Sequence, residues 1–305
     1  MNRRQTTPAL TGLVIILAIH VTGCNTFAEY GTKVAQTAGV LTSSQADSIT
    51  RSVAATEKTF RDITPEQEHY IGRSVAATVL GTYRPYDKPN LNQYINVLGQ
   101  SLATYSDKPT TFGGYHFLVM ETDEVNAFAA PGGLILVSRG LLRATQNEDE
   151  LAAVLAHEIA HVQNEDGLRA IKTGRLNTAL TTIALEAGKN VGKQSLAELT
   201  TNFEGTIKDI SSTLMNSGYS RSLEYQADAT AVKILERAGY DPQALVSALT
   251  KMQTQLARDK RGFGQTHPAP DARIENLKRL IGSKTVAGAP PQRQQRYAAA
   301  MAGLN

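Results

Sequence analysis

The sequence predicts an α+β fold that is mostly helical, with a small, mainly antiparallel sheet. Three observations support this: apolar residues at helical spacing along most of the chain, a change to short strand patterns between residues 115 and 138, and capping signals at several helix starts. A chain of 305 residues with 41% hydrophobic and 19% charged residues has the balance of a folded protein of one or two domains. The basic residues are interspersed with acidic ones and the net charge is only +3, so nucleic acid is not an expected partner.

Residues 1–23 have the pattern of a bacterial lipoprotein signal peptide. Two arginines precede an apolar run at 10–19, which is short for a membrane span but suits a secretory signal. Gly23 supplies the small residue that such cleavage sites need. The alternative is an ordinary signal peptide, or a short anchor, followed by a chance cysteine.

Cys24 is the only cysteine of the chain, so an intramolecular disulfide is excluded. We expect the mature chain to begin at a lipidated Cys24, to be held at a membrane by that lipid, and to work in the bacterial cell envelope. The residue after Cys24 is Asn25 and not an aspartate. By resemblance to enteric lipoproteins, this indicates the periplasmic face of the outer membrane. Residues 24–60 are rich in Gly, Ala, Thr and Ser and predict a tether with some helix.

The main domain is expected over residues 61–282. Its first helix should begin at Thr64, with Pro65 at the first helical position and Gln67 reaching back to the cap, and should continue through Val79. A second helix is expected at 91–105, where leucines and an isoleucine recur on one side.

Three short strands are expected next, at 115–121, 125–129 and 134–138, the last two around the Pro-Gly-Gly turn at 131–133. They should form the small sheet.

That helix should begin with the capping-box pattern Thr-Gln-Asn-Glu at 145–148 and last to about Asp166, where Gly167 stops it. Further helices are expected at 222–237, 242–257 and 271–280, and amphipathic stripes at 176–187 and 203–214 are not apolar enough to span a bilayer. The segment 283–305, rich in Ala, Pro and Gln, predicts a weakly ordered tail.

Two histidines and a glutamate interrupt the otherwise apolar segment VLAHEIAH at 154–161. On a helix, residues four apart point to the same side, so His157 and His161 present two imidazoles to one point in space, the spacing for binding one metal ion. Glu158, one step along, can reach a water at the metal without binding the metal itself. Zinc is the ion that this donor set favours. The alternative is a helix whose histidines are merely hydrogen-bonded.

A second pair of polar residues supports the metal site. Glu224 and Asp228 are also four apart on a predicted helix, so one carboxylate can bind the metal while the other accepts a hydrogen bond from the free N–H of a ligand histidine. Taken alone, two acidic residues at this spacing are more often surface charges. His69 and His116 have no partner in the sequence and are expected to be structural.

Four motifs in a fixed order resemble one known family. They are NAFAAPGGLILVSRGLL at 126–142, HEIAH at 157–161, a Glu-x-x-Ala-Asp helix at 224–228 and THPAPDARI at 266–274. Over about residues 60–281 the chain closely resembles the zinc metallopeptidases that include the CAAX prenyl protease and HtpX. More specifically, it is similar to their soluble periplasmic lipoprotein branch. No long apolar span and no tetratricopeptide repeat is evident, so the polytopic enzymes and repeat-bearing assembly factors match less well.

The resemblance implies a gluzincin-like α+β fold, mostly helical with the small sheet over the helix that carries HEIAH, and a set of residue roles. It implies that His157, His161 and Glu224 bind one zinc ion and that Glu158 is the general base. It also implies that Asp228 accepts a hydrogen bond from the free N–H of a ligand histidine.

Asn126, Ala127 and Phe128 are expected to form an exposed strand edge on which an extended or unfolded polypeptide substrate lies as an added strand. For Asn126, an ordinary turn residue is the alternative. His267 lies in a loop bounded by Gly and Pro and could act either as a fourth ligand that silences the site or as a donor to the tetrahedral oxyanion. An exposed loop histidine is its alternative. Arg273 could anchor that loop by pairing with a carboxylate.

These expectations combine into a zinc-dependent endopeptidase for quality control of unfolded or misassembled cell-envelope proteins. The alternative is a chaperone-like binding or assembly factor for outer-membrane proteins with latent proteolysis. A binder would not need Glu158 between the two metal-binding histidines, so the sequence favours the enzyme.

Overall fold

The computed structural model describes residues 63–169, 204–256, 266–282 and 288–304, which belong to one unit of the chain from Asp62 to Asn305. The expected signal peptide, the tether and the lipidation site Cys24 lie outside these residues, as does the amphipathic stripe at 176–187. Within the described residues, none of the helices has the length and apolar character needed to cross a membrane.

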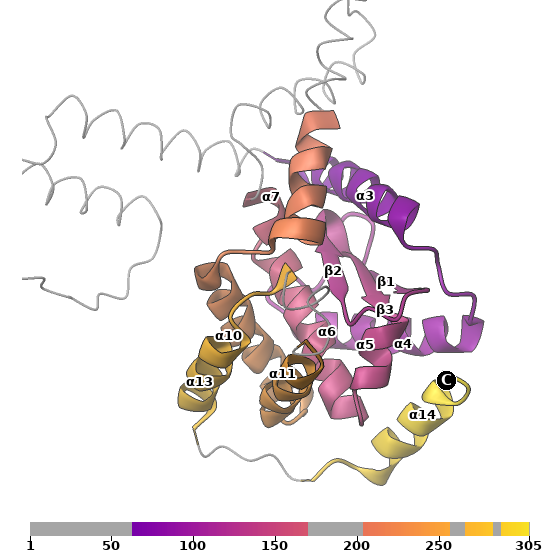
Figure 1. Ribbon diagram of the computed structural model, residues 1–305, viewed down its shortest axis with the longest axis vertical. Helices are drawn as coiled ribbons and strands as arrows, with labels where there is room; N and C mark the ends of the chain where they lie inside the picture. The colour runs from indigo at the N-terminus through magenta and orange to yellow at the C-terminus, as the bar shows by residue number, and fades with distance from the viewer. Residues whose placement is uncertain (1–62, 170–203, 257–265, 283–287, 305) are drawn as a thin grey trace, which may run out of the picture. The chain divides into compact units, whose positions relative to one another are not determined.

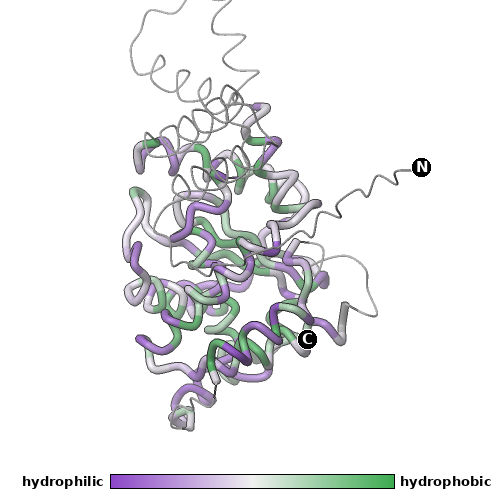
Figure 2. The backbone as a smooth tube through the Cα atoms, turned by 90° about the vertical axis from the view of Figure 1, so that its left-hand side faces the viewer, coloured by the Kyte–Doolittle hydropathy of each residue, from purple (hydrophilic) through white to green (hydrophobic). Residues whose placement is uncertain are grey.

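Helices surround a small sheet, as Figure 1 shows. The elements in chain order are α3 (Pro65–Thr82), α4 (Pro89–Ala103), β1 (His116–Met120), β2 (Ala127–Ala130), the 3-10 turn η1 (Pro131–Gly133), β3 (Leu134–Ser138), α5 (Arg139–Ala144), α6 (Glu148–Gln163), α7 (Asp166–Arg169), the π-helical turn η2 (Thr213–Ser217), α10 (Arg221–Ala238), α11 (Gln243–Leu256), α13 (Pro270–Ile281) and α14 (Pro291–Met301). The α+β prediction is confirmed. Hydrophilic and hydrophobic residues alternate along the helices (Figure 2), as amphipathic packing requires.

The capping box predicted for the first helix is present. The hydroxyl of Thr64 accepts a hydrogen bond from the backbone N–H of Gln67, and Oε1 of Gln67 accepts one from the backbone N–H of Thr64. The helix continues to Thr82 rather than ending at Val79. Local sequence therefore determines where α3 begins.

The sheet has the order β1-β3-β2 and is mixed rather than mainly antiparallel. β2 and β3 pair antiparallel across the η1 turn, while β1 pairs parallel with β3. The reason is that β3 inserts between the two earlier strands instead of adding beyond β2. Leu136 consequently faces Leu118 on one side and Phe128 on the other.

Side chains of α4 close the outer edge of β1. Oδ1 of Asn92 accepts a hydrogen bond from the backbone N–H of Val119 at 2.9 Å, and Oδ1 of Asn96 accepts one from the backbone N–H of Phe117 at 2.9 Å. The amide of Asn96 also donates to the carbonyl of Phe117. These amides replace the missing neighbour strand, so this part of the β1 edge cannot accept an added strand.

The predicted helix 145–166 begins and ends elsewhere. Ser138 caps the short helix α5, which the sequence did not indicate, and Thr145 closes that helix. The next helix, α6, therefore begins after Asn147, whose side chain accepts a hydrogen bond from the backbone N–H of Glu150. It ends at Gln163, and Gly167 lies inside α7 instead of stopping α6.

Helix α6 lies at the centre of the unit. All its residues from Glu148 to Val162 are buried, and it packs against α10, α11, α4 and β2. The helix that carries the HEIAH motif is therefore held on several sides by other elements, and its neighbour α10 carries Glu224 and Asp228.

The expectation of a weakly ordered C-terminal tail is wrong for residues 291–301, which form α14. Tyr297 is buried, and its hydroxyl donates to the carbonyl of Thr145 at 2.7 Å. Arg296 forms an ion pair with Glu148, the first residue of α6. The prediction rested on composition alone, and composition does not reveal that Tyr297 and Arg296 contact Thr145 and Glu148, which are distant in the sequence.

Candidate metal centre

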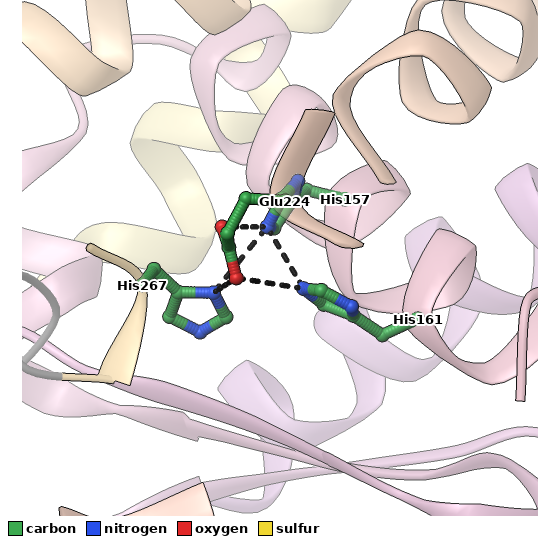
Figure 3. Close-up of side chains that lie close together, drawn as sticks. All are labelled: His157, His161, Glu224 and His267. Atoms are coloured by element: carbon green, nitrogen blue, oxygen red, sulfur yellow. Dashed lines mark hydrogen bonds and ion pairs between the residues drawn. The ribbon is translucent and has the colours of Figure 1, made fainter. Parts of the chain in front are cut away.

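Four side chains from three separate segments point toward one another (Figure 3). His157 and His161 come from α6, Glu224 from α10, and His267 from the segment just before α13. One ligand atom of each lies within 4.8 Å of the ligand atoms of the other three. All four are buried; the most accessible, His267, is 3% exposed, so the alternative of an exposed loop histidine does not hold.

The distances between these atoms fit a tetrahedral ion. Nε2 of His157 lies 3.1 Å from Nε2 of His161 and 3.4 Å from Nδ1 of His267. Glu224 oxygens lie 3.4 Å from Nε2 of His157, 3.6 Å from Nε2 of His161 and 3.2 Å from Nδ1 of His267. Ligands at zinc–nitrogen distances of about 2.0 to 2.1 Å would be about 3.3 Å apart in a tetrahedron. The donor set and its spacing therefore fit zinc.

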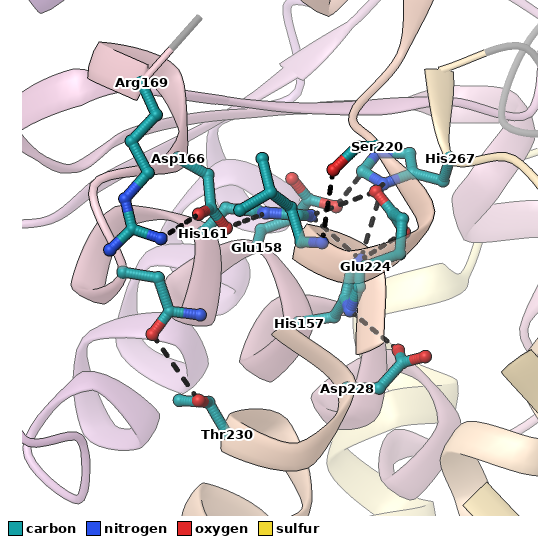
Figure 4. Close-up of polar contacts among 12 residues, drawn as sticks. His157, Glu158, His161, Asp166, Arg169, Ser220, Glu224, Asp228, Thr230 and His267 are labelled. Carbon is teal, nitrogen blue, oxygen red and sulfur yellow. Dashed lines mark hydrogen bonds and ion pairs between the residues drawn. The ribbon is translucent and has the colours of Figure 1, made fainter. Parts of the chain in front are cut away.

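The outward-facing nitrogens of the two α6 histidines each have a carboxylate partner (Figure 4). Nδ1 of His161 lies 2.8 Å from Oδ2 of Asp166, and Nδ1 of His157 lies 3.1 Å from Oδ1 of Asp228. A carboxylate accepts, so each Nδ1 carries the proton and each Nε2 presents a lone pair. Two lone pairs that face each other at 3.1 Å repel unless a cation or a proton lies between them.

The charges around His157 favour a positive charge at this point. Burial and the nearby Arg273 lower the pKa of His157, but hydrogen bonds to Asp228 and Glu224 outweigh them and raise it to about 9. Burial would raise the pKa of the Glu224 carboxyl, yet Arg273 and His267 hold it well below its ordinary value. The carboxylate is therefore ionised and available as a ligand.

Arg273 lies behind the site and contacts the carboxylates of Glu224 and Asp228. It is fully buried; its Nε and Nη2 lie 2.9 and 2.7 Å from the two oxygens of Asp228, and its Nη1 lies 2.7 Å from Glu224. Burial raises the pKa of Asp228, but Arg273 outweighs this and lowers it to about 2. The sequence suggested one carboxylate partner for Arg273, and the structure shows two.

Glu158 is buried beside the four ligand atoms, with both carboxylate oxygens available to a ligand. It is fully buried, and neither of its carboxylate oxygens has a hydrogen-bond partner among the residues that the structure describes. Oε1 lies 3.6 Å from Nε2 of His267. An ionised buried carboxylate needs donors, and a water bound beside a metal ion would supply them.

The predicted substrate edge is not exposed. β2 is an edge strand of the sheet, but the side chains of Ala127 and Phe128 are buried. Asn126 is also buried, and its Oδ1 accepts hydrogen bonds from the backbone N–H of Ala127 and from the hydroxyl of Thr266. These three residues are therefore packed in the interior, and Asn126 ties the start of β2 to the segment that carries His267.

Two residues near the centre were not found from the sequence. Asp166 follows His161 by five residues but lies beyond the end of α6, where helical spacing no longer predicts direction. Tyr219 stacks on His161 with 4.4 Å between ring centroids and an interplanar angle of 29°. No pattern in the sequence indicates Tyr219, because only the approach of the two segments creates the stack.

Comparison with known proteins gives a family match. The model of peptidase family M48 matches residues 89–281. The beta-barrel assembly-enhancing protease of Escherichia coli O157:H7 is 31% identical over 218 residues, which cover 70% of this chain and 43% of that protein. The mitochondrial metalloendopeptidase OMA1 of Schizosaccharomyces pombe is 30% identical over 162 residues, which cover 51% of this chain and 43% of that protein. A protease HtpX homolog of Fusobacterium nucleatum is 32% identical over 145 residues, which cover 44% of this chain and 45% of that protein. The matches therefore span less than half the length of each of these relatives.

Proposed function

Because the chain belongs to peptidase family M48, we propose that it is a zinc-dependent endopeptidase that cleaves unfolded or misassembled cell-envelope polypeptides. The observation that carries this proposal is the meeting of four buried ligand atoms beside a buried glutamate without hydrogen-bond partners in the described part of the chain. A factor that only binds polypeptides would give Glu158 no role in this position.

Three side chains would hold the ion: Nε2 of His157, Nε2 of His161 and a carboxylate oxygen of Glu224. Zinc bound there supplies a Lewis acid that polarises the scissile carbonyl and lowers the pKa of a water molecule. Asp228 and Asp166 keep the Nδ1 protons in place, so the lone pairs of both histidines stay directed at the ion. Arg273 pairs with the carboxylates of Glu224 and Asp228 and so holds both beside His157.

Glu158 would act as the general base. Its carboxylate takes a proton from the attacking water and later passes it to the nitrogen of the departing amine. Burial supports this role, because the base is shielded from bulk water and has no hydrogen-bond donor among the described residues that would compete for its oxygens.

His267 would serve as a removable fourth ligand. Its Nδ1 lies 3.4 Å from Nε2 of His157 and 3.2 Å from Oε1 of Glu224, which is the spacing of the other ligand atoms. A fourth protein ligand in this position would exclude a substrate carbonyl from the ion, so the arrangement would be a resting state. Donation to the oxyanion would require His267 to move away from the ligand atoms.

The place of action would be the bacterial cell envelope, with Cys24 lipidated and the chain attached to the periplasmic face of the outer membrane. The signal-like pattern at 1–23 supports this, and the name of the Escherichia coli relative indicates a bacterial envelope process. Substrate would approach near β2, once the segment that carries His267 has moved and the strand edge at Asn126, Ala127 and Phe128 is accessible.

Cleavage of an unfolded protein such as casein, with and without a zinc chelator, tests the proposal. Glu158→Gln should retain zinc, measured by elemental analysis, and lower kcat/KM by about 10²- to 10⁴-fold. Glu275→Gln, on an exposed face of α13, is the matched control and should behave as the wild type. His267→Ala should raise the cleavage rate. Chelator-resistant cleavage that Glu158→Gln does not change would rule the proposal out.

A further inference from the structure

A groove of about 530 Å³ lies on the face of the sheet that is turned away from the metal centre. Along β1 and β3, alternate residues such as Phe117 and Ile135 enter the core that includes α6. The residues between them, Leu118, Leu134 and Leu136, point to the other face and line the groove. No ligand atom of the metal centre lines this groove.

The groove exists because α3 crosses this face at one end. α3 packs against η1, β2 and β3 rather than along β1. At Gly72 the helix approaches the turn so closely that an added Cβ would lie 1.7 Å from the carbonyl oxygen of Pro131. The glycine thereby keeps α3 against η1, and Leu118 of β1 stays half-buried.

The two walls of the groove are apolar. On the α3 side they are formed by Ala76, Ala77 and Leu80, and on the sheet side by the three leucines of β1 and β3. Ala77 is exposed, so small side chains on the helix leave room above the leucines. Such a surface gains free energy when it covers apolar side chains of a partner, at about 25 cal/mol for each Å² removed from water.

Basic and imidazole groups lie among these apolar residues. Arg73, His69 and His116 also line the groove. Arg73 is exposed and forms no ion pair with any described residue, although its guanidinium is always charged. A carboxylate placed here would pair with the Arg73 guanidinium.

Two exposed aromatic side chains extend the apolar surface next to His69. Tyr70 is 45% and Phe112 is 57% exposed, and their ring centroids lie 5.7 and 5.6 Å from that of His69. Exposed aromatic residues beside a basic group are typical of surfaces that bind other proteins.

We infer that this groove binds an extended polypeptide segment that combines apolar side chains with an acidic one. The groove is partly open to solvent, which suits a polypeptide segment better than a small molecule that must be enclosed. Asn96 seals the β1 edge at the groove, so recognition acts through side chains and not through an added strand. This inference goes beyond the proposed peptidase activity and does not depend on it, because the two sites share no residue.

Fluorescence anisotropy with a defined probe tests the inference. The probe is a fluorescein-labelled peptide of alternating leucine and threonine with one central glutamate, about eight residues long. Full-length protein carrying Glu158→Gln is used throughout so that the probe is not consumed. Ala77→Trp in this background fills the groove and should weaken binding about tenfold or more. Ala298→Trp, on the exposed face of α14, is the matched control and should bind like the parent.

Charge specificity is tested with a probe whose glutamate is replaced by lysine. The parent should bind it about five- to tenfold more weakly, and Arg73→Glu should reverse that preference, whereas Arg279→Glu on α13 should not. Circular dichroism must show that each variant is folded like the parent. Absence of probe binding, or binding that Ala77→Trp leaves unchanged, would overturn the inference. Equal binding of both probes, or displacement of the probe by a fatty acid alone, would overturn the choice of an acidic polypeptide.

Discussion

Nδ1 of His161 donates a hydrogen bond to Oδ2 of Asp166 across 2.8 Å, and both side chains are buried. Asp166 is contributed by α7, after the end of the helix that carries His161. The contact fixes which nitrogen of His161 is protonated and aims the other at Glu224, whose Oε1 lies 3.6 Å away. The turn between α6 and α7 therefore takes part in the geometry of the candidate metal centre.

Replacing Asp166 should weaken zinc binding. In Asp166→Asn the partner of the Nδ1 proton loses its charge, and the affinity for zinc is expected to fall by about 10- to 100-fold. Competition with a chromogenic chelator of known affinity measures this without relying on activity. Asp107→Asn, an exposed aspartate, is the control and should leave the affinity unchanged. Equal zinc affinity in Asp166→Asn and the wild type would show that the contact does not support the ligand.

Removing Arg273 should destabilise the protein in the absence of zinc. Arg273→Met leaves the carboxylates of Asp228 and Glu224 buried without their cation, at a cost of about 3 to 5 kcal/mol. The free energy of unfolding is measured by urea titration followed by circular dichroism, with a chelator present; the chain contains no tryptophan to report by fluorescence. Arg279→Met, on the exposed face of the same helix, should cost no more than about 0.5 kcal/mol. Similar costs for the two variants would contradict the role of the buried pair.

Asp228 should make stability depend on acid pH. Arg273 and His157 lower its folded pKa from 3.8 to about 2, against the effect of burial. Its contribution is therefore fully present above the unfolded value and is lost as pH falls through the folded one. The loss should be on the order of 2 kcal/mol between about pH 5 and pH 2. Urea titration measures the free energy of unfolding at the two pH values. In Asp228→Asn, the decrease in this free energy from pH 5 to pH 2 should be smaller than in the wild type by about 2 kcal/mol. In Asp271→Asn, the decrease should equal that of the wild type.

The C-terminal helix should contribute to the stability of the whole unit. Tyr297→Phe removes the hydrogen bond to Thr145 and should cost about 1 kcal/mol. Tyr297→Ala also removes the buried ring and should cost about 3 to 5 kcal/mol. Thermal unfolding and urea titration measure both. Gln295→Ala, exposed on the same helix, is the control; a Tyr297→Ala variant no less stable than this control would mean that α14 is not packed on the unit.

Some of the structure follows from short-range sequence alone. His157 and His161 share one face of α6, and Glu224 and Asp228 share one face of α10, because the period of a helix is a local property. The start of α3 at Thr64 is local for the same reason, since its cap and the residue that reaches back are three positions apart. The resemblance to a peptidase family rested on motifs of this local kind.

Local sequence thus fixes the faces of single helices, several helix starts and the chemical type of the candidate metal centre. Four features could be seen only in the folded chain: β3 lies between β1 and β2, Asp166 supports His161, Arg273 joins two carboxylates, and α14 packs beside α6. The physical reason is that periodicity and capping act over a few residues. Contacts between distant segments depend instead on which surfaces pack together with the fewest unpaired polar groups, and that choice involves the whole chain at once.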